Sequence, residues 1–512
     1  MKKTIFIISA LLLMAASACQ KDDGSRILKA TLERYDSNDA KAYINSDNYA
    51  CWKSGDEVSI NGSPYTITLD QEGHAVIDVS DLSHVALSAF YPAHRINGTT
   101  VTFPYIQEYN ADDQGRQIID NPMAAYCPAD GTELRFRNLG ALLKVTLKPT
   151  STIQVRAIEV KGVDNQMLCG EATLKRNSSG DPILTKCTDG HNSVVLHFDT
   201  PQEVTSAGRE FYIVVPASSD FYDFTIAVLA SENGTYRHHC KTNTIAQALS
   251  RNHIGAIKYT LDHNDGTFMP AWGIRYTAEE TVTPNTENWG VSLISNSNGR
   301  LLFDDILTTI GDNAFQGCNT LQSMTLPISV TTIGDYAFHK CILFTSITLP
   351  DNLTTIGDYA FYSCSFHYIA LPNGLQSIGN YAFFNCLIEN IALPTGLQSI
   401  GEGAFANCVS LPRITIPNGI TEIKRSTFLN CDNLEEVVLP ASINHIGEAA
   451  FKDCQALKYI ICHPTNPPSI GSTTFLDLTQ YIDVYVPMGK SSAYAYAWEG
   501  KAPEHFDYID YL

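Results

Sequence analysis

Apolar side chains recur at a fixed spacing through the C-terminal half of the chain. In each repeat an Ile is followed, after four residues, by a Phe that is usually preceded by Ala, and a Cys usually follows three residues after the Phe. The phenylalanines of this pattern lie 22 to 24 residues apart, at Phe315, Phe338, Phe361, Phe383, Phe405, Phe428, Phe451 and Phe475. A fixed period of this length predicts a solenoid, in which each repeat forms one turn and stacks on the next.

One repeat, from Ile333 to Leu349, shows how the pattern builds a turn. After Cys341, the apolar positions Phe344, Ile347 and Leu349 follow the L-x-x-L-x-L spacing of a short strand whose alternate side chains point into the solenoid. The residues between them are polar and are expected to point outward. A proline follows the strand in most repeats, where the chain must turn and a missing N–H does least harm.

The repeats resemble the BspA-like leucine-rich repeat proteins, a bacterial surface family. The resemblance is carried by segments such as 356–364, Ile-Gly-Asp-Tyr-Ala-Phe-Tyr-Ser-Cys, and 347–350, Ile-Thr-Leu-Pro, and it covers residues 272 to 498. Residues 272–303 resemble the β cap that opens such arrays, and Val484 to Pro487 with Tyr494 and Trp498 resemble the closing cap. The resemblance implies a complete solenoid with a long recognition surface.

The N-terminal half has a different pattern, with many short strand-like segments between turn signals. Val58 and Ile60 alternate on one side of Asn-Gly-Ser-Pro, and Tyr65, Ile67 and Leu69 alternate on the other, which predicts a β-hairpin. No helical period dominates residues 27–262, so we expect an all-β module of sandwich type. Its length suits two sandwiches, with a division near residue 150.

Several segments of this module resemble the fimbrillin-like family of bacterial lipoproteins and pilus subunits. The segments are Trp52–Val58 (W-x-x-G-D-x-V), Ala89–Pro92, Asn121–Ala124, Leu134–Leu143 and Arg251–His253, in the family's order. The resemblance implies tandem transthyretin-like β-sandwiches and, in some members, polymerisation by strand donation. A whole solenoid follows the segment that would be donated, which argues against polymerisation here.

The N-terminus carries a secretory signal. Two lysines precede an apolar run from Ile5 to Met14, and small residues then lead to Cys19. Signal peptidase and lipoprotein processing would both cut before Cys19, and the following Lys21, Asp22 and Asp23 resemble an export tag for surface lipoproteins. We therefore expect a lipid-anchored Cys19 and an outer-membrane protein exposed at the cell surface.

The predicted organisation follows from these segments: a signal peptide at 1–18, a tag and linker at 19–26, the β module at 27–262, and a linker with the solenoid cap at 263–303. The leucine-rich repeats occupy 304–478, and a closing cap and tail occupy 479–512. The fold class is therefore mainly β, with a fimbrillin-like tandem sandwich followed by a leucine-rich repeat solenoid.

The composition of the chain limits the partners and the kinds of chemistry that we expect. With 34 basic and 54 acidic residues the formal net charge is −20, and no basic patch is present that would favour a nucleic acid partner. Fourteen cysteines include no C-x-x-C pair, and the repeated Cys is expected to be a small buried side chain of the core. No G-x-S-x-G, H-E-x-x-H or phosphate-binding loop is present, so we expect no enzyme, no cofactor and no metal site.

Binding is then expected on the outward strand positions of the repeats, which change from turn to turn. The side chains of first interest are Tyr368, Arg413 and Tyr459, because aromatics and Arg often dominate interface energy, with His367, Glu435 and Lys458 beside them. The favoured function is adhesion to host extracellular matrix, host-cell proteins or other bacteria. The alternatives are an accessory or tip subunit of a fimbria, bound to fimbrial subunits, and a glycan-binding lipoprotein.

Overall fold

The structure is a computed structural model, and it describes most of the chain from Ile27 to Tyr511. The described residues are 27–32, 57–61, 63–69, 75–82, 86–91, 96–97, 99–111, 117–118, 121–127, 133–162, 167–176, 182–185, 187, 191–217, 223–244, 254–261 and 270–511. The signal segment, Cys19, and the tag residues Lys21, Asp22 and Asp23 lie outside them, as do Trp52 and Arg251–His253.

The chain divides into two compact units, and both are built mainly from β-strands. One unit comprises Met1–Asn233 and Arg237–Asp265, and the other comprises Gly234–Tyr236 and Gly266–Leu512. The described residues contain one α-helix, α1 (Ser491–Trp498), and one 3-10 turn, η1 (Ser80–Leu82). The predicted mainly-β class is confirmed.

The N-terminal unit contains an eight-stranded sheet that encloses its own apolar core. In spatial order its strands are β3 (Ser63–Thr66), β2 (Glu57–Ile60), β6 (Leu87–Tyr91), β12 (Met123–Cys127), β13 (Glu133–Asn138), β1 (Ile27–Leu32), β5 (Ala75–Asp78) and β4 (Thr68–Leu69). The predicted hairpin is the β2–β3 pair, with Ile60 opposite Ser63. Alternation places Val58 and Ile60 in the core and leaves Ser59 on the opposite face of the sheet.

Two further sheets of this unit face each other across a second core. One has the order β19 (Arg209–Pro216), β14 (Gly140–Lys148) and β22 (Ile254–Thr260); the other has the order β21 (Thr235–Thr244), β20 (Asp223–Glu232), β15 (Ile153–Gly162), β18 (Ser193–Val204) and β9 (Ile106–Glu108). Both contribute side chains to one cluster, including Leu143 and Ile158. Residue 150 therefore lies in the turn between two sheets that share a core, and the change from one core to the next falls near Leu139.

A small four-stranded sheet completes the described part of the N-terminal unit. Its order is β17 (Pro182–Leu184), β16 (Gly170–Arg176), β8 (Thr100–Phe103) and β7 (Ile96–Asn97), and a separate hairpin joins β10 (Asn110–Ala111) to β11 (Gln117–Ile118). Phe103, Leu174 and Ile96 pack with Leu142 of β14 in a third apolar cluster. These contacts attach the small sheet to the neighbouring β layers.

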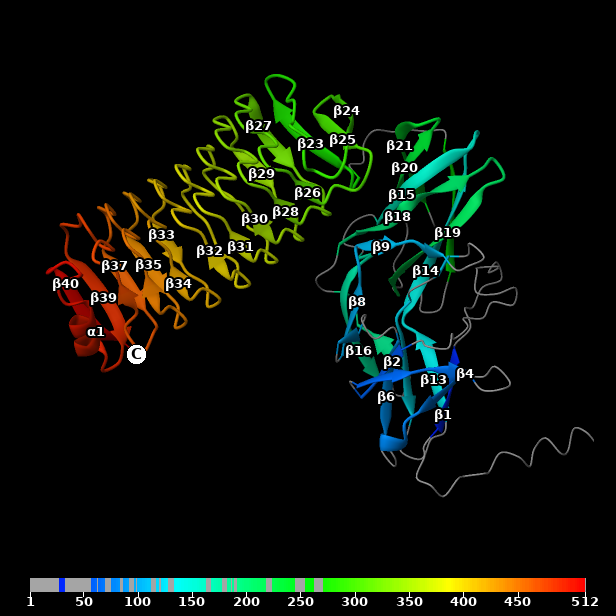
Figure 1. Cartoon of the computed structure of the whole chain (residues 1–512), viewed down its shortest axis with the longest axis horizontal. Helices are drawn as coiled ribbons and strands as arrows, with labels where there is room; N and C mark the ends of the chain where they lie inside the picture. The colour runs from blue at the N-terminus through cyan, green and yellow to red at the C-terminus, as the bar shows by residue number, and fades with distance from the viewer. Residues whose placement is uncertain are drawn as a thin grey trace, which may run out of the picture. The chain divides into compact units, whose positions relative to one another are not determined.

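The C-terminal unit begins with an antiparallel cap and continues as a parallel ladder along the solenoid (Figure 1). The cap and first turns form the sheet β24 (Leu293–Ser297), β25 (Arg300–Phe303), β23 (Gly273–Ala278), β27 (Leu321–Thr325) and β29 (Ser346–Thr348). A single parallel bridge, Tyr368 to Asn390, continues the line. The ladder resumes with β33 (Arg413–Thr415), β35 (Glu436–Leu439), β37 (Tyr459–Cys462), β39 (Ile482–Pro487) and β40 (Phe506–Tyr511).

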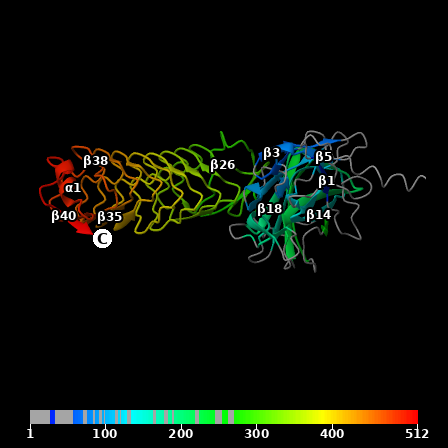
Figure 2. The same ribbon diagram turned by 90° about the horizontal axis from the view of Figure 1, so that it is seen from below.

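A second ladder of two-residue strands runs along another side of each turn, and Figure 2 shows the successive turns stacked like a coil. These strands are β26 (Thr309–Ile310), β28 (Thr332–Ile333), β30 (Thr355–Ile356), β31 (Ser377–Ile378), β32 (Ser399–Ile400), β34 (Glu422–Ile423), β36 (His445–Ile446) and β38 (Ser469–Ile470). Each one buries its Ile and turns its polar residue outward.

The phenylalanines of the repeat form the centre of the solenoid. All eight, from Phe315 to Phe475, are buried, and neighbouring rings stack with centroids 5.2 to 5.7 Å apart and planes 5° to 14° from parallel. A single turn would expose most of this apolar surface, so the turns are stable only together. The predicted solenoid is confirmed.

The end of the solenoid is covered by α1 and β40. Tyr494 and Trp498 of the helix are buried; the Tyr494 hydroxyl donates to the Pro464 carbonyl at 2.8 Å and the Trp498 indole N–H donates to the Pro468 carbonyl at 2.8 Å. Trp498 also contacts the last core ring, Phe475, at 5.7 Å between centroids. Over the described residues, no helix has the length and apolar character needed to span a membrane.

Candidate functional site

The longer ladder of the solenoid presents a regular outward face, which we call the strand face. Arg413, Glu436 and Tyr459 are opposite one another in register on β33, β35 and β37, and Asp483 and Asp507 continue the same column on β39 and β40. On the first turns the column consists of small residues, Ser323 and Ser346. The large and charged side chains are therefore grouped on the later turns.

The structure places the three side chains of first interest on this face. Tyr368 is 63% exposed and forms the isolated bridge with Asn390, while Tyr459 is 39% exposed and Arg413 is exposed. Each directly precedes a buried isoleucine, Ile369, Ile460 or Ile414. The core residue thus fixes the backbone, while its neighbour is free to vary without disturbing the packing.

The other three predicted residues lie one position earlier and form polar side-chain pairs between turns. His367 Nδ1 is 3.0 Å from Glu389 Oε1, and Lys458 Nζ is 3.1 Å from Glu435 Oε1. All four side chains are more than half exposed, at 59%, 65%, 52% and 52%. Exposed pairs of this kind contribute only about 0 to 1 kcal/mol, so the fold does not depend on them. They remain accessible to a partner.

A polar ladder joins the turns on another side of the solenoid. Asp335 Oδ1 accepts the backbone N–H of Asp358 at 2.7 Å, and Asp358 Oδ1 accepts that of Asn380 at 2.6 Å. The second oxygen of Asp358 accepts the Asn380 side-chain amide at 3.0 Å, and Asn380 Oδ1 accepts the N–H of Glu402 at 2.8 Å. These side chains satisfy backbone donors that the turns would otherwise expose, so their role is explained by the fold.

The same turns carry two columns of stacked aromatic rings that the sequence analysis did not identify. We call them the aromatic turn face. Tyr336, Tyr359 and Tyr381 stack with centroids 4.8 and 5.1 Å apart. The second column contains His339, Tyr362 and Phe384, with centroids 4.8 and 4.7 Å apart. All six side chains are partly exposed.

Backbone geometry shows that the tyrosines are not the residues that the turn itself favours. Tyr336, Tyr359 and Tyr381 have φ of 57°, 56° and 54°, in the left-handed region that favours Asn and Gly. The equivalent positions of other turns hold Asn313, Gly403, Ser426 and Ala449. Stacking offsets part of this cost, and the column is interrupted at Gly403, against which the Tyr381 ring lies.

The cysteines of the repeat are committed to the core. The thiols of Cys341, Cys364, Cys386, Cys408, Cys431 and Cys454 each donate to a Phe carbonyl of the preceding turn, at 3.0 to 3.2 Å. Burial raises the pKa of Cys408 to about 12 and that of the partly exposed Cys318 to about 11. Thiolates, the reactive and metal-binding form, are therefore disfavoured along the column.

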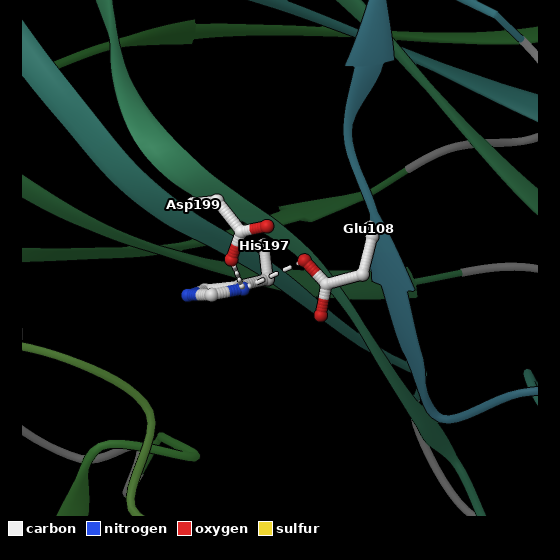
Figure 3. Close-up of side chains that lie close together, drawn as sticks. All are labelled: Glu108, His197 and Asp199. Atoms are coloured by element: carbon white, nitrogen blue, oxygen red, sulfur yellow. Dashed lines mark hydrogen bonds and ion pairs between the residues drawn. The ribbon is translucent and has the colours of Figure 1, made fainter. Parts of the chain in front are cut away.

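In the N-terminal unit, three side chains with metal-ligand chemistry meet between β9 and β18 (Figure 3). Glu108 Oε2 is 2.8 Å from His197 Nδ1, and Asp199 Oδ1 is 3.8 Å from the same nitrogen. The donor set could hold a divalent cation. Both carboxylates are substantially exposed, at 50% and 87%, and both lie beside the same imidazole nitrogen, which already has a hydrogen-bond partner in Glu108.

A family comparison assigns the repeats of the second unit. Residues 308–387 and 376–502 match the BspA type leucine rich repeat region, in six copies. The C-terminal unit is a BspA-type leucine-rich repeat solenoid. The matched residues include the strand face from Tyr368 to Tyr459 and the whole aromatic turn face. No curated protein matches the chain.

Solved structures with similar features include two leucine-rich repeat proteins. One, from Bacteroides ovatus, is 24% identical with a TM-score of 0.31, and the alignment covers 38% of this chain and only 61% of that one. The leucine-rich repeat protein of T. pallidum is 26% identical with a TM-score of 0.23, covering 39% of this chain and 73% of that one. A proposed cell adhesion protein from Bacteroides ovatus is 11% identical with a TM-score of 0.29, and the alignment covers 46% of this chain and 91% of that one.

Proposed function

We propose that the chain is a non-enzymatic surface lipoprotein that mediates adhesion through the strand face of its leucine-rich repeat solenoid. The observation that carries the proposal is the column of Arg413, Glu436 and Tyr459, in which the exposed Arg413 and Tyr459 flank the half-buried Glu436 on a parallel ladder fixed by buried aliphatic residues. A rigid ladder holds these side chains in place before binding, which reduces the entropy cost of association. The expected partner is a host matrix or cell-surface protein, or another bacterium.

The N-terminal unit would serve as the module between the anchor and the solenoid. Its β layers and the W-x-x-G-D-x-V and A-F-Y-P segments support a fimbrillin-like tandem sandwich. Under this proposal Cys19 carries the lipid, and Lys21, Asp22 and Asp23 direct the lipoprotein to the outer surface of the outer membrane. The membrane contact is then made by the lipid alone.

Surface display can be tested on intact cells. Protease added to intact wild-type cells should degrade the solenoid, so that an antibody against it no longer detects it. In cells in which Lys21, Asp22 and Asp23 are replaced with Ser, the solenoid should be protected. Replacing Cys19 with Ala should release the chain from the membrane fraction. A solenoid that stays protected in intact wild-type cells would place the protein inside the outer membrane and refute surface adhesion.

Adhesion itself can be tested by removing the solenoid. A strain producing the chain without residues 272–498 should lose attachment to immobilised matrix proteins or host cells, while its lipoprotein level in the outer membrane stays the same. The matched strain carries the full chain at the same level. Unchanged attachment in the deletion strain would exclude the solenoid as the adhesive part.

A second candidate is an accessory or tip subunit of a fimbria, and the fimbrillin-like segments of the N-terminal unit favour it. This function predicts that the chain is recovered with the sheared pilus fraction and that deletion of the N-terminal unit abolishes the recovery. If the chain is an adhesin that does not belong to a fimbria, it should be recovered only with the membrane fraction. A glycan-capture function would instead give saccharide-dependent retention on an affinity gel together with attachment that does not depend on the solenoid.

A further inference from the structure

A pocket of about 810 Å³ opens in the N-terminal unit between two of its sheets. One wall is the outer face of the eight-stranded sheet, where Ser59, Ser88, Phe90 and Tyr126 point away from the core behind them. The other wall comes from the β7–β8 hairpin and the end of β16. Ligand pockets in proteins generally have volumes of about 300 to 1,000 Å³, so this one has room for a sugar of one or two rings.

The charge of the pocket is opposite to that of the chain. The chain has 54 acidic and 34 basic residues, yet the twelve described residues that line the pocket include Lys175 and Arg176 and no carboxylate. Within the described part of the molecule, neither cation has an ion-pair partner. Two cations in a concave site whose described lining has no carboxylate favour an anionic ligand.

Arg176 is held in position before any ligand arrives. Its guanidinium carbon lies 3.5 Å from the centre of the Tyr126 ring, and its Nη2 donates to the Ser88 hydroxyl at 3.1 Å. The stacked arrangement fixes the plane of the fork and leaves its other N–H groups available. A planar fork held this way suits a carboxylate, which accepts two parallel hydrogen bonds from Arg.

The rest of the lining matches the body of a saccharide. Phe90, Ile96 and Leu174 supply apolar surface for the C–H face of a sugar ring. Asn97 and Thr99 on the rim, with Ser59 on the opposite wall, offer amide and hydroxyl groups for sugar hydroxyls. A bare phosphate or sulfate would use the cations but not this apolar floor.

We propose that this pocket binds a saccharide that carries a carboxylate, such as a uronic or sialic acid, with Arg176 holding the carboxylate and Lys175 adding charge at the rim. The site belongs to the N-terminal unit and is independent of the strand face. Its failure would leave the proposed adhesion through the solenoid untouched.

Titration calorimetry on the purified chain tests the proposal with galacturonic acid, N-acetylneuraminic acid, neutral galactose and inorganic sulfate as probes. At least one acidic sugar should bind. Galactose should bind at least about tenfold more weakly, because it lacks the carboxylate that would accept charged hydrogen bonds from Arg176. Arg176→Gln should weaken binding of the acidic sugar by a similar factor. Lys175→Gln, a rim change with little structural risk, should weaken it less and in the same direction.

Arg425→Gln is the matched control, because it removes an exposed arginine of the solenoid that lies outside the strand face, and it should leave sugar binding unchanged. Thermal unfolding of each variant shows whether it is folded. Equal affinity for galactose and galacturonic acid, equal affinity of the Arg176→Gln variant and the wild type, or no binding of either acidic sugar would overturn the proposal. Sulfate that binds as tightly as the acidic sugars would reduce the site to a simple anion site and overturn the saccharide assignment.

Discussion

The thiol of Cys386 donates a hydrogen bond to the carbonyl oxygen of Phe361 at 3.1 Å, 25 residues earlier in the sequence. The bond joins the two recurring columns of the repeat pattern, the Cys of one turn and the Phe of the turn before. It explains why the position holds Cys rather than another small apolar residue. A thiol fills the space of a small side chain and also satisfies a buried carbonyl.

Cys386→Ala should lower the free energy of unfolding at pH 7 by about 1 to 2 kcal/mol, through loss of this bond and of sulfur packing. Urea unfolding followed by tryptophan fluorescence measures it, since Trp272, Trp289 and Trp498 all lie in the C-terminal unit. An unchanged unfolding midpoint would show that the bond contributes nothing.

The same variant gives a prediction about pH. Burial raises the pKa of Cys386 well above its usual value, so the folded state keeps the proton while the unfolded thiol ionises above about pH 8.5. Its stabilising contribution is complete below that pH and falls as pH rises, by about 1.4 kcal/mol per unit. The stability advantage of the wild type over Cys386→Ala should therefore fall by about 2 kcal/mol between pH 7 and pH 10, which removes or reverses it. A difference that is constant with pH would contradict it.

Gly401→Ala should destabilise the solenoid severely. A Cβ at this position would overlap the backbone of Gly379 and Asn380 in the preceding turn, and neither can move without breaking the ladder. Overpacking against a fixed backbone costs about 1 to 3 kcal/mol or more. Gly396→Ala is the control, because the atom nearest to its Cβ would be the Asn373 carbonyl oxygen at 3.1 Å. Urea unfolding should separate the two variants clearly.

Strand-face substitutions should reduce adhesion without changing the fold. Arg413→Ala and Tyr459→Ala each remove an exposed side chain, so the free energy of unfolding should change by less than about 0.5 kcal/mol. A residue at the centre of an interface contributes about 2 kcal/mol or more, which corresponds to a loss of affinity of about thirtyfold. Thr348→Ala, on an early turn of the same ladder, is the control. Full adhesion of the double variant would move the search to another face.

The aromatic turn face is the other surface of the solenoid to be tested for adhesion. Tyr359→Asn removes ring contacts with Tyr336, Tyr362 and Tyr381, worth about 0.5 to 1.5 kcal/mol each, and it also removes the cost of about 1 to 2 kcal/mol that a left-handed tyrosine carries. The two effects partly cancel, so the net loss of stability should lie between about zero and 3 kcal/mol. Because we assign adhesion to the strand face, attachment of cells carrying this variant should be normal. A loss of attachment with intact folding would transfer the assignment to the aromatic turn face.

The solenoid could be predicted in detail because the same spacing of apolar residues recurs in every turn. Eight phenylalanines in register defined the core, and the alternation around Ile347 and Ile369 separated outward from inward positions on the strands. The aromatic turn face was missed although Tyr336, Tyr359 and Tyr381 recur in the sequence. Those residues lie in turns, which have no twofold alternation from which to infer the direction of a side chain.

In the N-terminal unit, sequence patterns could predict strands but not the sites between them. Glu108 and His197 are 89 residues apart and meet only because β9 pairs in parallel with β18. The pocket takes residues from six strands and two hairpin turns, and its key contact joins Arg176 to Tyr126. Pairings of this kind depend on the order of strands in a sheet, which local patterns do not contain.

Hydrogen bonds that run from one turn to the next also limit how this chain can evolve. The Cys386 thiol and the Asp358 carboxylate are satisfied by a neighbouring turn, so any two turns that keep these columns are interchangeable partners. Unequal recombination between repeats can therefore add or delete whole turns and preserve every contact, while an insertion of a few residues within a turn would break them. The length of the solenoid can thus change in discrete steps of one turn, with the terminal caps kept intact.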